Sequence, residues 1–168
     1  MIDLYFFDSD CISTFLHIER EDIILSLYNT KIHISSFVYQ ELMHAPLPIS
    51  ANIKKLVDSK KVLVDNICYG DPYYKEFVHL TRSTENGFLI DTGEASVIAL
   101  VKHKGGVLAS NNLRDVEYYV KKYELKHITT VGIIRQAIKE KIITIDEANS
   151  VYKKMKDNGD KLPSIVFK

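Results

Sequence analysis

Short apolar runs alternate with amphipathic segments from one end of the chain to the other. Apolar and β-branched runs predict strands at Ile2–Phe7, Lys31–Ser35, Lys61–Ile67, Val107–Ser110 and His127–Thr129. Apolar residues at helical spacing predict one or two helices within Ile12–Tyr28, and further helices at Phe37–His44, around Ile53, Leu56 and Val57, at Pro72–Arg82, from Asp91 to Gly105-Gly106, at Asp115–Tyr123, from Thr130 to about Lys141, and from Thr144 through Lys156. Alternating strands and helices favour a parallel sheet covered by helices on both faces. The pattern therefore predicts an α/β fold of three layers, α/β/α, with a mainly parallel sheet of four or five strands.

Capping residues mark the starts of three helices in the second half of the chain. Asp91 and Glu94 have the spacing of a capping box, in which two side chains satisfy the free amides of the first helical turn. Thr144 and Glu147 repeat that spacing before the last helix. Thr130 is expected to cap the helix between them.

The composition limits the classes of protein to which the chain can belong, but it does not identify the function. The chain has 168 residues, which suits one domain with its own core. Lys+Arg and Asp+Glu both number 22, so total charge gives no support to generic polyanion binding. Cys11 and Cys68 form no metal-binding pair and are expected to be reduced thiols. The first residues carry acids where a signal peptide needs bases, and no apolar run is long enough for a bilayer, so a soluble cytoplasmic protein without a membrane partner is expected.

Polar residues follow two of the predicted strands directly. Asp8 opens the cluster Asp-Ser-Asp after the first strand, and the segment 110–115, Ser-Asn-Asn-Leu-Arg-Asp, follows the fourth. In parallel sheets the functional crevice lies outside the carboxyl ends of the strands. Two helical acids, Glu41 and Glu94, stand between these clusters in the sequence. The chain thus offers several carboxylates that such a fold brings towards one edge of the sheet.

This order of residues resembles the PIN domain family. Members have a strand that ends in an Asp, an acid on an early helix, an acid that opens a later helix, and a Thr/Ser-Asn-Asp-like loop after a strand. The corresponding residues here are Asp8, Glu41, Glu94 and the loop 110–112, and Asp-Thr-Gly-Glu-Ala at 91–95 is similar to an Asp-x-Gly-Glu-Ala variant of some prokaryotic members. The resemblance covers about residues 1–142 of a single domain, with 143–168 as a helical extension.

The resemblance implies a metal-dependent ribonuclease. Its catalytic carboxylates would be Asp8, Glu41, Glu94 and Asp115, and the same residues with Asn112 would bind Mg²⁺ or Mn²⁺. Hard cations prefer oxygen ligands, and a bound cation relieves the repulsion among converging carboxylates. Asn112 departs from the family, which usually has Asp there. An amide oxygen brings no negative charge, so we expect weak metal binding and a role for Asn112 in orienting Asp115 or a metal-bound water.

Partners also follow from the resemblance. The substrate would be RNA, in a single strand or a loop. Many small prokaryotic PIN domains are toxins that a cognate antitoxin neutralises, and many form homodimers. A toxin–antitoxin pair, an antitoxin partner and a homodimer are therefore expectations for this chain.

Other interpretations of the same residues stay open. Asp8 and Asp91 suit helix caps, and Glu94 suits the third position of a capping box. A catalytically degenerate PIN domain that binds RNA or protein is the main alternative, and Asn112 is its main support. The Asp8-Ser9-Asp10 sequence also fits a haloacid-dehalogenase-type phosphohydrolase with Asp8 as nucleophile. That family needs a late acidic motif, whereas the late strand exit here reads Ser-Asn-Asn.

Overall fold

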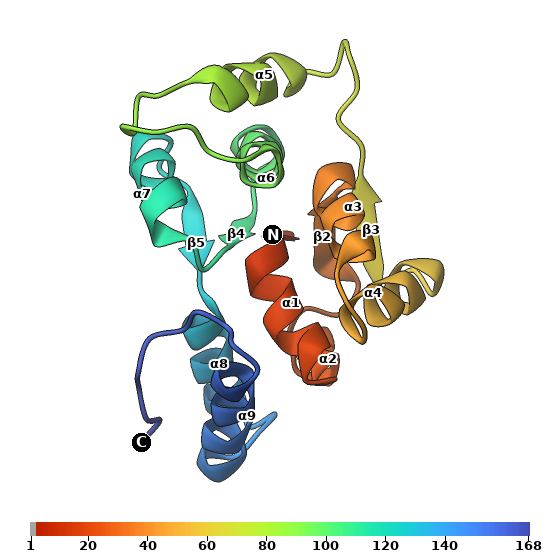
Figure 1. Ribbon diagram of the computed structural model, residues 1–168, viewed down its shortest axis with the longest axis vertical. Helices are drawn as coiled ribbons and strands as arrows, with labels where there is room; N and C mark the ends of the chain where they lie inside the picture. The colour runs from red at the N-terminus through yellow and green to blue at the C-terminus, as the bar shows by residue number, and fades with distance from the viewer. Residues whose placement is uncertain (1–2) are drawn as a thin grey trace.

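A five-stranded parallel sheet runs through the middle of the molecule (Figure 1). The structure is a computed structural model that describes residues 3–168. Its strands are β1 (Tyr5–Phe7), β2 (Ile32–Ser35), β3 (Val62–Asp65), β4 (Val107–Ala109) and β5 (Lys126–Ile128). Their order is β3-β2-β1-β4-β5, and each neighbouring pair is parallel. All carboxyl ends of the strands therefore face the same edge.

Helices cover both faces of this sheet, which confirms the three-layer α/β/α prediction. They are α1 (Ser9–His17), α2 (Glu21–Tyr28), α3 (Ser36–His44), α4 (Ile49–Asp58), α5 (Tyr74–Arg82), α6 (Thr92–Lys104), α7 (Leu113–Lys122), α8 (Thr130–Lys139) and α9 (Ile145–Asp157), with a 3₁₀ turn at Asn29–Lys31. In Figure 1, α5, α6 and α7 lie on one side of the sheet, and α1, α2, α8 and α9 lie on the other. No helix within residues 3–168 combines the length and the apolar character needed to cross a membrane.

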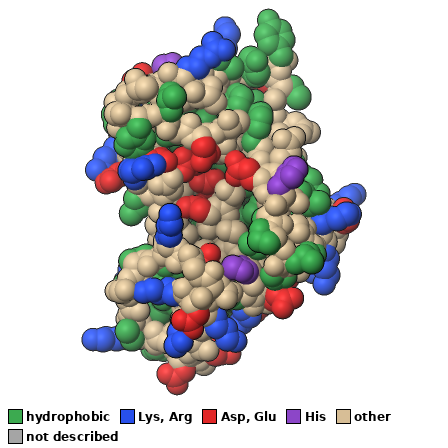
Figure 2. All heavy atoms as spheres, viewed as in Figure 1, with side chains coloured by type: hydrophobic (Ala, Val, Ile, Leu, Met, Phe, Trp, Pro, Cys, Tyr) green, Lys and Arg blue, Asp and Glu red, His purple; other side chains and the backbone are tan. Residues whose placement is uncertain are grey.

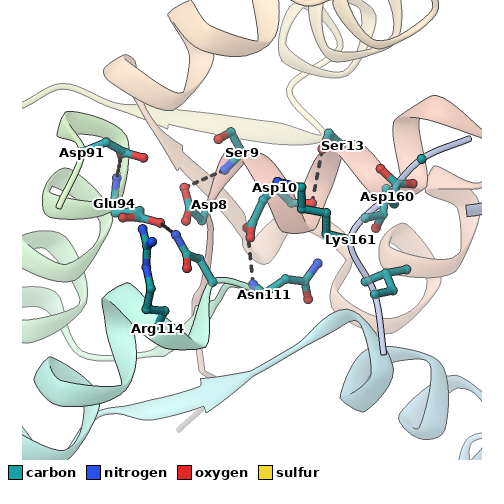
Figure 3. Close-up of a pocket in the computed structure, with 14 residues that line it drawn as sticks. Asp8, Ser9, Asp10, Ser13, Asp91, Glu94, Asn111, Arg114, Asp160 and Lys161 are labelled. Atoms are coloured by element: carbon teal, nitrogen blue, oxygen red, sulfur yellow. Dashed lines mark hydrogen bonds between the residues drawn. The ribbon is translucent and has the colours of Figure 1, made fainter. Parts of the chain in front are cut away.

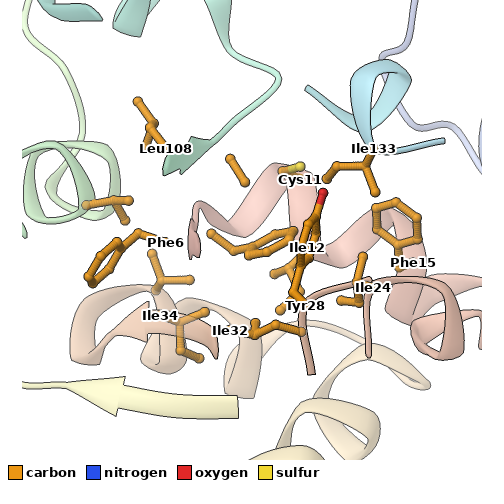
Figure 4. Packing of buried hydrophobic residues seen from close by; sticks show 14 of the residues in the cluster. Phe6, Cys11, Ile12, Phe15, Ile24, Tyr28, Ile32, Ile34, Leu108 and Ile133 are labelled. Carbon is orange, nitrogen blue, oxygen red and sulfur yellow. The ribbon is translucent and has the colours of Figure 1, made fainter. Parts of the chain in front are cut away.

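Strand β1 forms the centre of the core because it is buried on both faces. Phe6 and Phe7 are fully buried, as the strands of a doubly covered parallel sheet must be. Phe6 stands in register with His33 of β2 and Leu108 of β4. Figure 4 shows the apolar side chains that pack here, including Ile12, Phe15, Ile24, Tyr28, Ile32, Ile34, Leu108 and Ile133. This packing fixes the position at which β1 ends.

Most predicted elements are present, and several of their ends shift by one to three residues. The predicted first strand starts at Ile2, which lies outside the described residues. The expectation that Thr130 caps α8 is wrong: the Thr129 side chain accepts from the amide of Gly132 instead. Thr130 is buried, and its amide and hydroxyl are both hydrogen bonded to the side chain of Asn111. The Thr144 capping box is confirmed in full.

The entry to β4 depends on two glycines. Gly106 has φ +104°, and a Cβ atom there would lie 2.5 Å from the carbonyl oxygen of Leu4. The next amide, that of Val107, donates to this oxygen at 2.8 Å. Gly105 also has positive φ, but a Cβ at that position would meet nothing within 4 Å. Both glycines thus have a backbone conformation that other residues rarely adopt, but only at Gly106 would an added Cβ clash with a neighbouring atom.

Gly106→Ala is expected to destabilise the protein more than Gly105→Ala. Both substitutions incur the cost of a left-handed backbone, about 1–3 kcal/mol. Only Gly106→Ala adds a clash with Leu4, which costs about 1–3 kcal/mol more. Urea unfolding of both variants measures the difference. Equal losses of unfolding free energy would show that the approach of Leu4 to Gly106 does not constrain this strand.

Candidate active site

Asp8 lies where β1 ends, at the centre of the carboxyl edge. Its Oδ1 accepts from the amide of Ser9 at 2.8 Å, so Asp8 does cap α1. Its Oδ2 accepts from the hydroxyl of Ser110 at 3.2 Å, which joins the exits of β1 and β4. Only 3% of Asp8 is exposed. The cap and the position at the sheet edge are therefore two properties of the same carboxylate.

Glu94 is in the first turn of α6, but its side chain does not complete a capping box. Asp91 caps the helix, and its Oδ1 accepts from the amide of Glu94 at 2.8 Å. The Glu94 carboxyl turns away from the cap. Its Oε1 accepts a hydrogen bond from the side-chain nitrogen Nδ2 of Asn112. Its Oε2 is buried and has no hydrogen-bond partner among the described residues. The unpartnered oxygen indicates that this carboxyl serves something other than the helix end.

Asn112 bridges two carboxylates. Besides its bond to Glu94, its Nδ2 donates to Oδ2 of Asp115 at 2.7 Å. Arg114 Nε donates to Oδ1 of Asp115 at 2.6 Å, and its guanidinium lies 4.8 Å from the ring of Phe88. Asp115 is thus held from both sides and is only 5% exposed. The amide of Asn112 occupies the space between Glu94 and Asp115 as a hydrogen-bond donor.

Glu41 stands at the rim of this arrangement. Much of its side chain, which extends from α3, is exposed. Its carboxyl lies against Gly93, where an added Cβ would be 2.5 Å from Oε1. Partial burial of that carboxyl raises its pKa, and the charges of Asp91 and Asp10 add to the effect. Gly93 is therefore the residue that leaves room for the Glu41 carboxyl.

These side chains surround a pocket of about 580 Å³. It is lined by Asp8, Ser9, Asp10, Ser13, Thr14, Asp91, Glu94, Asn111, Asn112, Arg114, Gly159, Asp160, Lys161 and Leu162. Figure 3 shows most of these side chains, and Figure 2 shows acidic groups gathered in the middle of this face with basic groups around them. Of the predicted site residues, Asp8, Glu94 and Asn112 line the pocket. Asp115 reaches it through Asn112, and Glu41 borders it beside Gly93.

The pocket contains residues that the ribonuclease interpretation of the sequence did not assign to the site. Asp10 lies in the first turn of α1, and its Oδ1 accepts from the amide of Asn111 at 3.3 Å. Its spacing of two from Asp8 was an available signal. Asp160 and Lys161 come from the segment after α9. No sequence motif marks them, because only the folded path of the chain brings them here.

Crowded and desolvated carboxyls hold their protons more tightly. Burial, followed by the charge of Asp10, holds the pKa of Asp8 well above its usual range. Burial, followed by the charge of Asp8, raises the pKa of Glu94 to about 9. Asp115 differs because its hydrogen bond from Arg114 lowers its pKa. The environment of Asp8 and Glu94 disfavours negative charge unless a cation compensates for it.

The donor set fits a hard divalent cation. All candidate ligands offer oxygen atoms, and Glu94 Oε2 is buried with no hydrogen-bond partner in the described part of the chain. Within residues 3–168, however, no three acidic, histidine or cysteine side chains stand close enough to coordinate one ion. A cation would therefore have to draw the carboxylates together. Asp8 and Glu94 are the residues best placed to hold it, because both are buried at the wall of the same pocket.

Comparison with known proteins agrees with this geometry. A family model described as a PIN domain (DUF3368) matches residues 4–167, which includes the C-terminal helical segment. No curated protein matches the chain. The match favours the PIN interpretation over the haloacid-dehalogenase one, and PIN domains have a nuclease-type fold. With almost its whole length matched, the chain belongs to the PIN domain family.

Proposed function

We propose that this PIN domain is an endoribonuclease that hydrolyses RNA phosphodiester bonds with the help of Mg²⁺ or Mn²⁺. The observation that carries the proposal is the Glu94 carboxyl. Its Oε2 is buried, and no residue from 3 to 168 is hydrogen bonded to it, in a pocket whose walls also hold Asp8, Asp10 and Asp91. A stable fold rarely retains such a group unless it has a use, because an unpaired buried polar atom costs about 1–3 kcal/mol.

Each residue has a distinct task in this proposal. Asp8 and Glu94 hold the cation, and Asn112 and Arg114 keep the Asp115 carboxylate in a fixed orientation. Glu41 adds a carboxylate from the exposed rim, where it can reach solvent water and substrate. When bound, a divalent cation stabilises the charge that develops on a phosphate and makes water more acidic.

RNA in a single strand or a loop is the proposed substrate, because unstacked nucleotides can enter a pocket at the edge of a sheet. The toxin role, the antitoxin partner and the homodimer that the resemblance implied stay predictions.

A catalytically degenerate domain that binds RNA or protein is the second candidate function. One observation favours it. The Asn112 amide donates to both Glu94 and Asp115, so a neutral side chain stands between these carboxyls where the PIN family usually has an Asp. The first and third of the following predictions distinguish the two candidates through catalysis, and the second does so through metal binding.

Asp8→Asn is expected to lower RNA cleavage by at least about 100-fold while the fold persists. Asn keeps an oxygen for the amide of Ser9 but loses the negative charge that holds a cation. Cleavage of a labelled single-stranded RNA in Mn²⁺ and in EDTA measures the effect. Asp58→Asn is the matched control, since Asp58 pairs with Lys54 on an exposed helix end. Full activity of the Asp8 variant, or activity in EDTA, would contradict the mechanism.

Asn112→Asp is expected to lower the thermal stability of the metal-free protein and to tighten Mn²⁺ binding on the order of tenfold. The substitution replaces a shared donor by a further carboxylate, which repels Glu94 and Asp115 until a cation arrives. Thermal shift and calorimetric titration with Mn²⁺ measure the two effects. Asn111→Asp adds the same charge one residue earlier, where the side chain bonds Thr130 instead. Unchanged or weaker Mn²⁺ binding by the Asn112 variant would show that position 112 is not a weakened ligand position, and the degenerate-domain candidate would lose its main support.

Gly93→Ala is expected to lower kcat/KM about tenfold with little loss of stability. The added methyl group displaces the Glu41 carboxyl, which is the movable end of an exposed side chain. Alanine also suits the first turn of a helix better than glycine. In a Glu41→Ala background the Gly93→Ala change should have no further effect on activity. An equal loss in both backgrounds would mean that Gly93 acts independently of Glu41.

A further inference from the structure

The segment that follows α9 forms one wall of the acidic pocket. Residues 159–162 line it, beside Asp8 and Asp10. Hydrogen bonds anchor this segment on both sides. The amide of Asp160 donates to the carbonyl of Met155 at 3.2 Å, and the hydroxyl of Tyr152 donates to the carbonyl of Pro163 at 2.7 Å. The wall is therefore a fixed part of the fold.

Later residues strengthen this anchor. The backbone of Phe167 makes two hydrogen bonds with the side chain of Asn149, at 2.9 and 3.1 Å. The Phe167 ring is buried against Tyr152, with ring centroids 5.4 Å apart. Lys156 donates to the hydroxyl of Ser164 at 2.7 Å. The segment is thus attached to α9 well beyond the point where it passes the pocket.

Two cations face the five acids that line this pocket. Arg114 is engaged, because its guanidinium makes two hydrogen bonds to Asp115. Lys161 is exposed, and no carboxylate oxygen within residues 3–168 lies within 4.0 Å of its ammonium group. Figure 3 shows Lys161 on the side of the pocket opposite Arg114, with Asp8 and Asp10 between them. Among the described residues, Lys161 is therefore the cation lining this pocket that makes no ion pair within the protein.

We propose that Lys161 binds a backbone phosphate of the RNA next to the phosphate that is cut. This inference rests on the proposed ribonuclease function and deepens it. A polyanion that approaches an acidic pocket is repelled, so binding needs positive charge close to the acids. Lysine supplies a mobile point charge with three donors, which suits a phosphate whose position varies. The segment after α9 then acts as part of the substrate site.

An RNA-binding lysine leaves a signature that a structural lysine does not. Lys161→Ala should raise KM on the order of fivefold with kcat changed less than about twofold, as expected for loss of one exposed ionic contact. The slope of log affinity against log salt should also fall by about 0.7, the value for one phosphate contact with a single strand. Lys161→Arg keeps the charge and should restore KM.

The experiment uses the full chain and a fluorescein-labelled 12-nucleotide single-stranded RNA. Steady-state cleavage in Mn²⁺ gives kcat and KM for the wild type, Lys161→Ala, Lys161→Arg and Lys154→Ala. Lys154 is the matched control because it is an exposed lysine of α9 that does not line the pocket. Fluorescence anisotropy with each change placed in the non-cutting Asp8→Asn protein gives affinity and salt slope without cleavage.

The outcomes separate this inference from the proposed function. A weaker, less salt-dependent complex for Lys161→Ala alone, rescued by Lys161→Arg, supports the phosphate contact. Equal effects of Lys161→Ala and Lys154→Ala, or no change in the salt slope, overturn it even if the wild type cleaves RNA. Absence of cleavage by the wild type refutes the ribonuclease proposal, while the anisotropy series still decides whether Lys161 binds RNA.

Discussion

Hydrogen bonding of β1 to a parallel strand on each side determines where the polar side chains of the site stand. β1 is only Tyr5–Phe7, yet it pairs with β2 and β4 and its two phenylalanines are fully buried. Because β1 is enclosed on both sides, it ends at the same carboxyl edge of the sheet as β2 and β4. Asp8 must therefore emerge beside the exit of β4, and the Asp8–Ser110 hydrogen bond records that constraint. The acidic pocket is a consequence of sheet order.

The acidic pocket lowers the stability of the fold locally, because it buries carboxyl groups close to one another. Burial raises the pKa values of Asp8 and Glu94, which means that the folded protein resists their ionisation. The surrounding apolar core makes this tolerable because it is large and continuous. Asn112 reduces the repulsion between the Glu94 and Asp115 carboxyls, because its side-chain amide donates a hydrogen bond to each of them. The same amide thus stabilises the arrangement of these carboxyls without the further negative charge that an Asp would bring.

Local patterns in the sequence were sufficient to predict most of the elements, and the place of Asp8 directly after a buried strand put it at the carboxyl edge of the sheet. The role of Glu94 came from the resemblance to the PIN family, because capping chemistry alone would have made it the third residue of a capping box. Local patterns predicted the wrong helix cap where two adjacent threonines could both serve as one. Thr130 has the residue type of a cap, but Asn111 binds it, and Thr129 caps α8 instead. Lys161 carries no local signal at all, because its position depends on contacts between α9 and the residues after it.

The Ser110–Asp8 hydrogen bond joins residues that are 102 positions apart in the chain. It continues the pairing of β1 with β4, in which Phe6 stands in register with Leu108 and Phe7 with Ala109. The strand pairing that builds the core is therefore also the one that brings Asp8 to Ser110. A chain in which these two strands are not paired keeps the Asp8 carboxyl in water, so the cost of burying it is met only when the sheet itself forms.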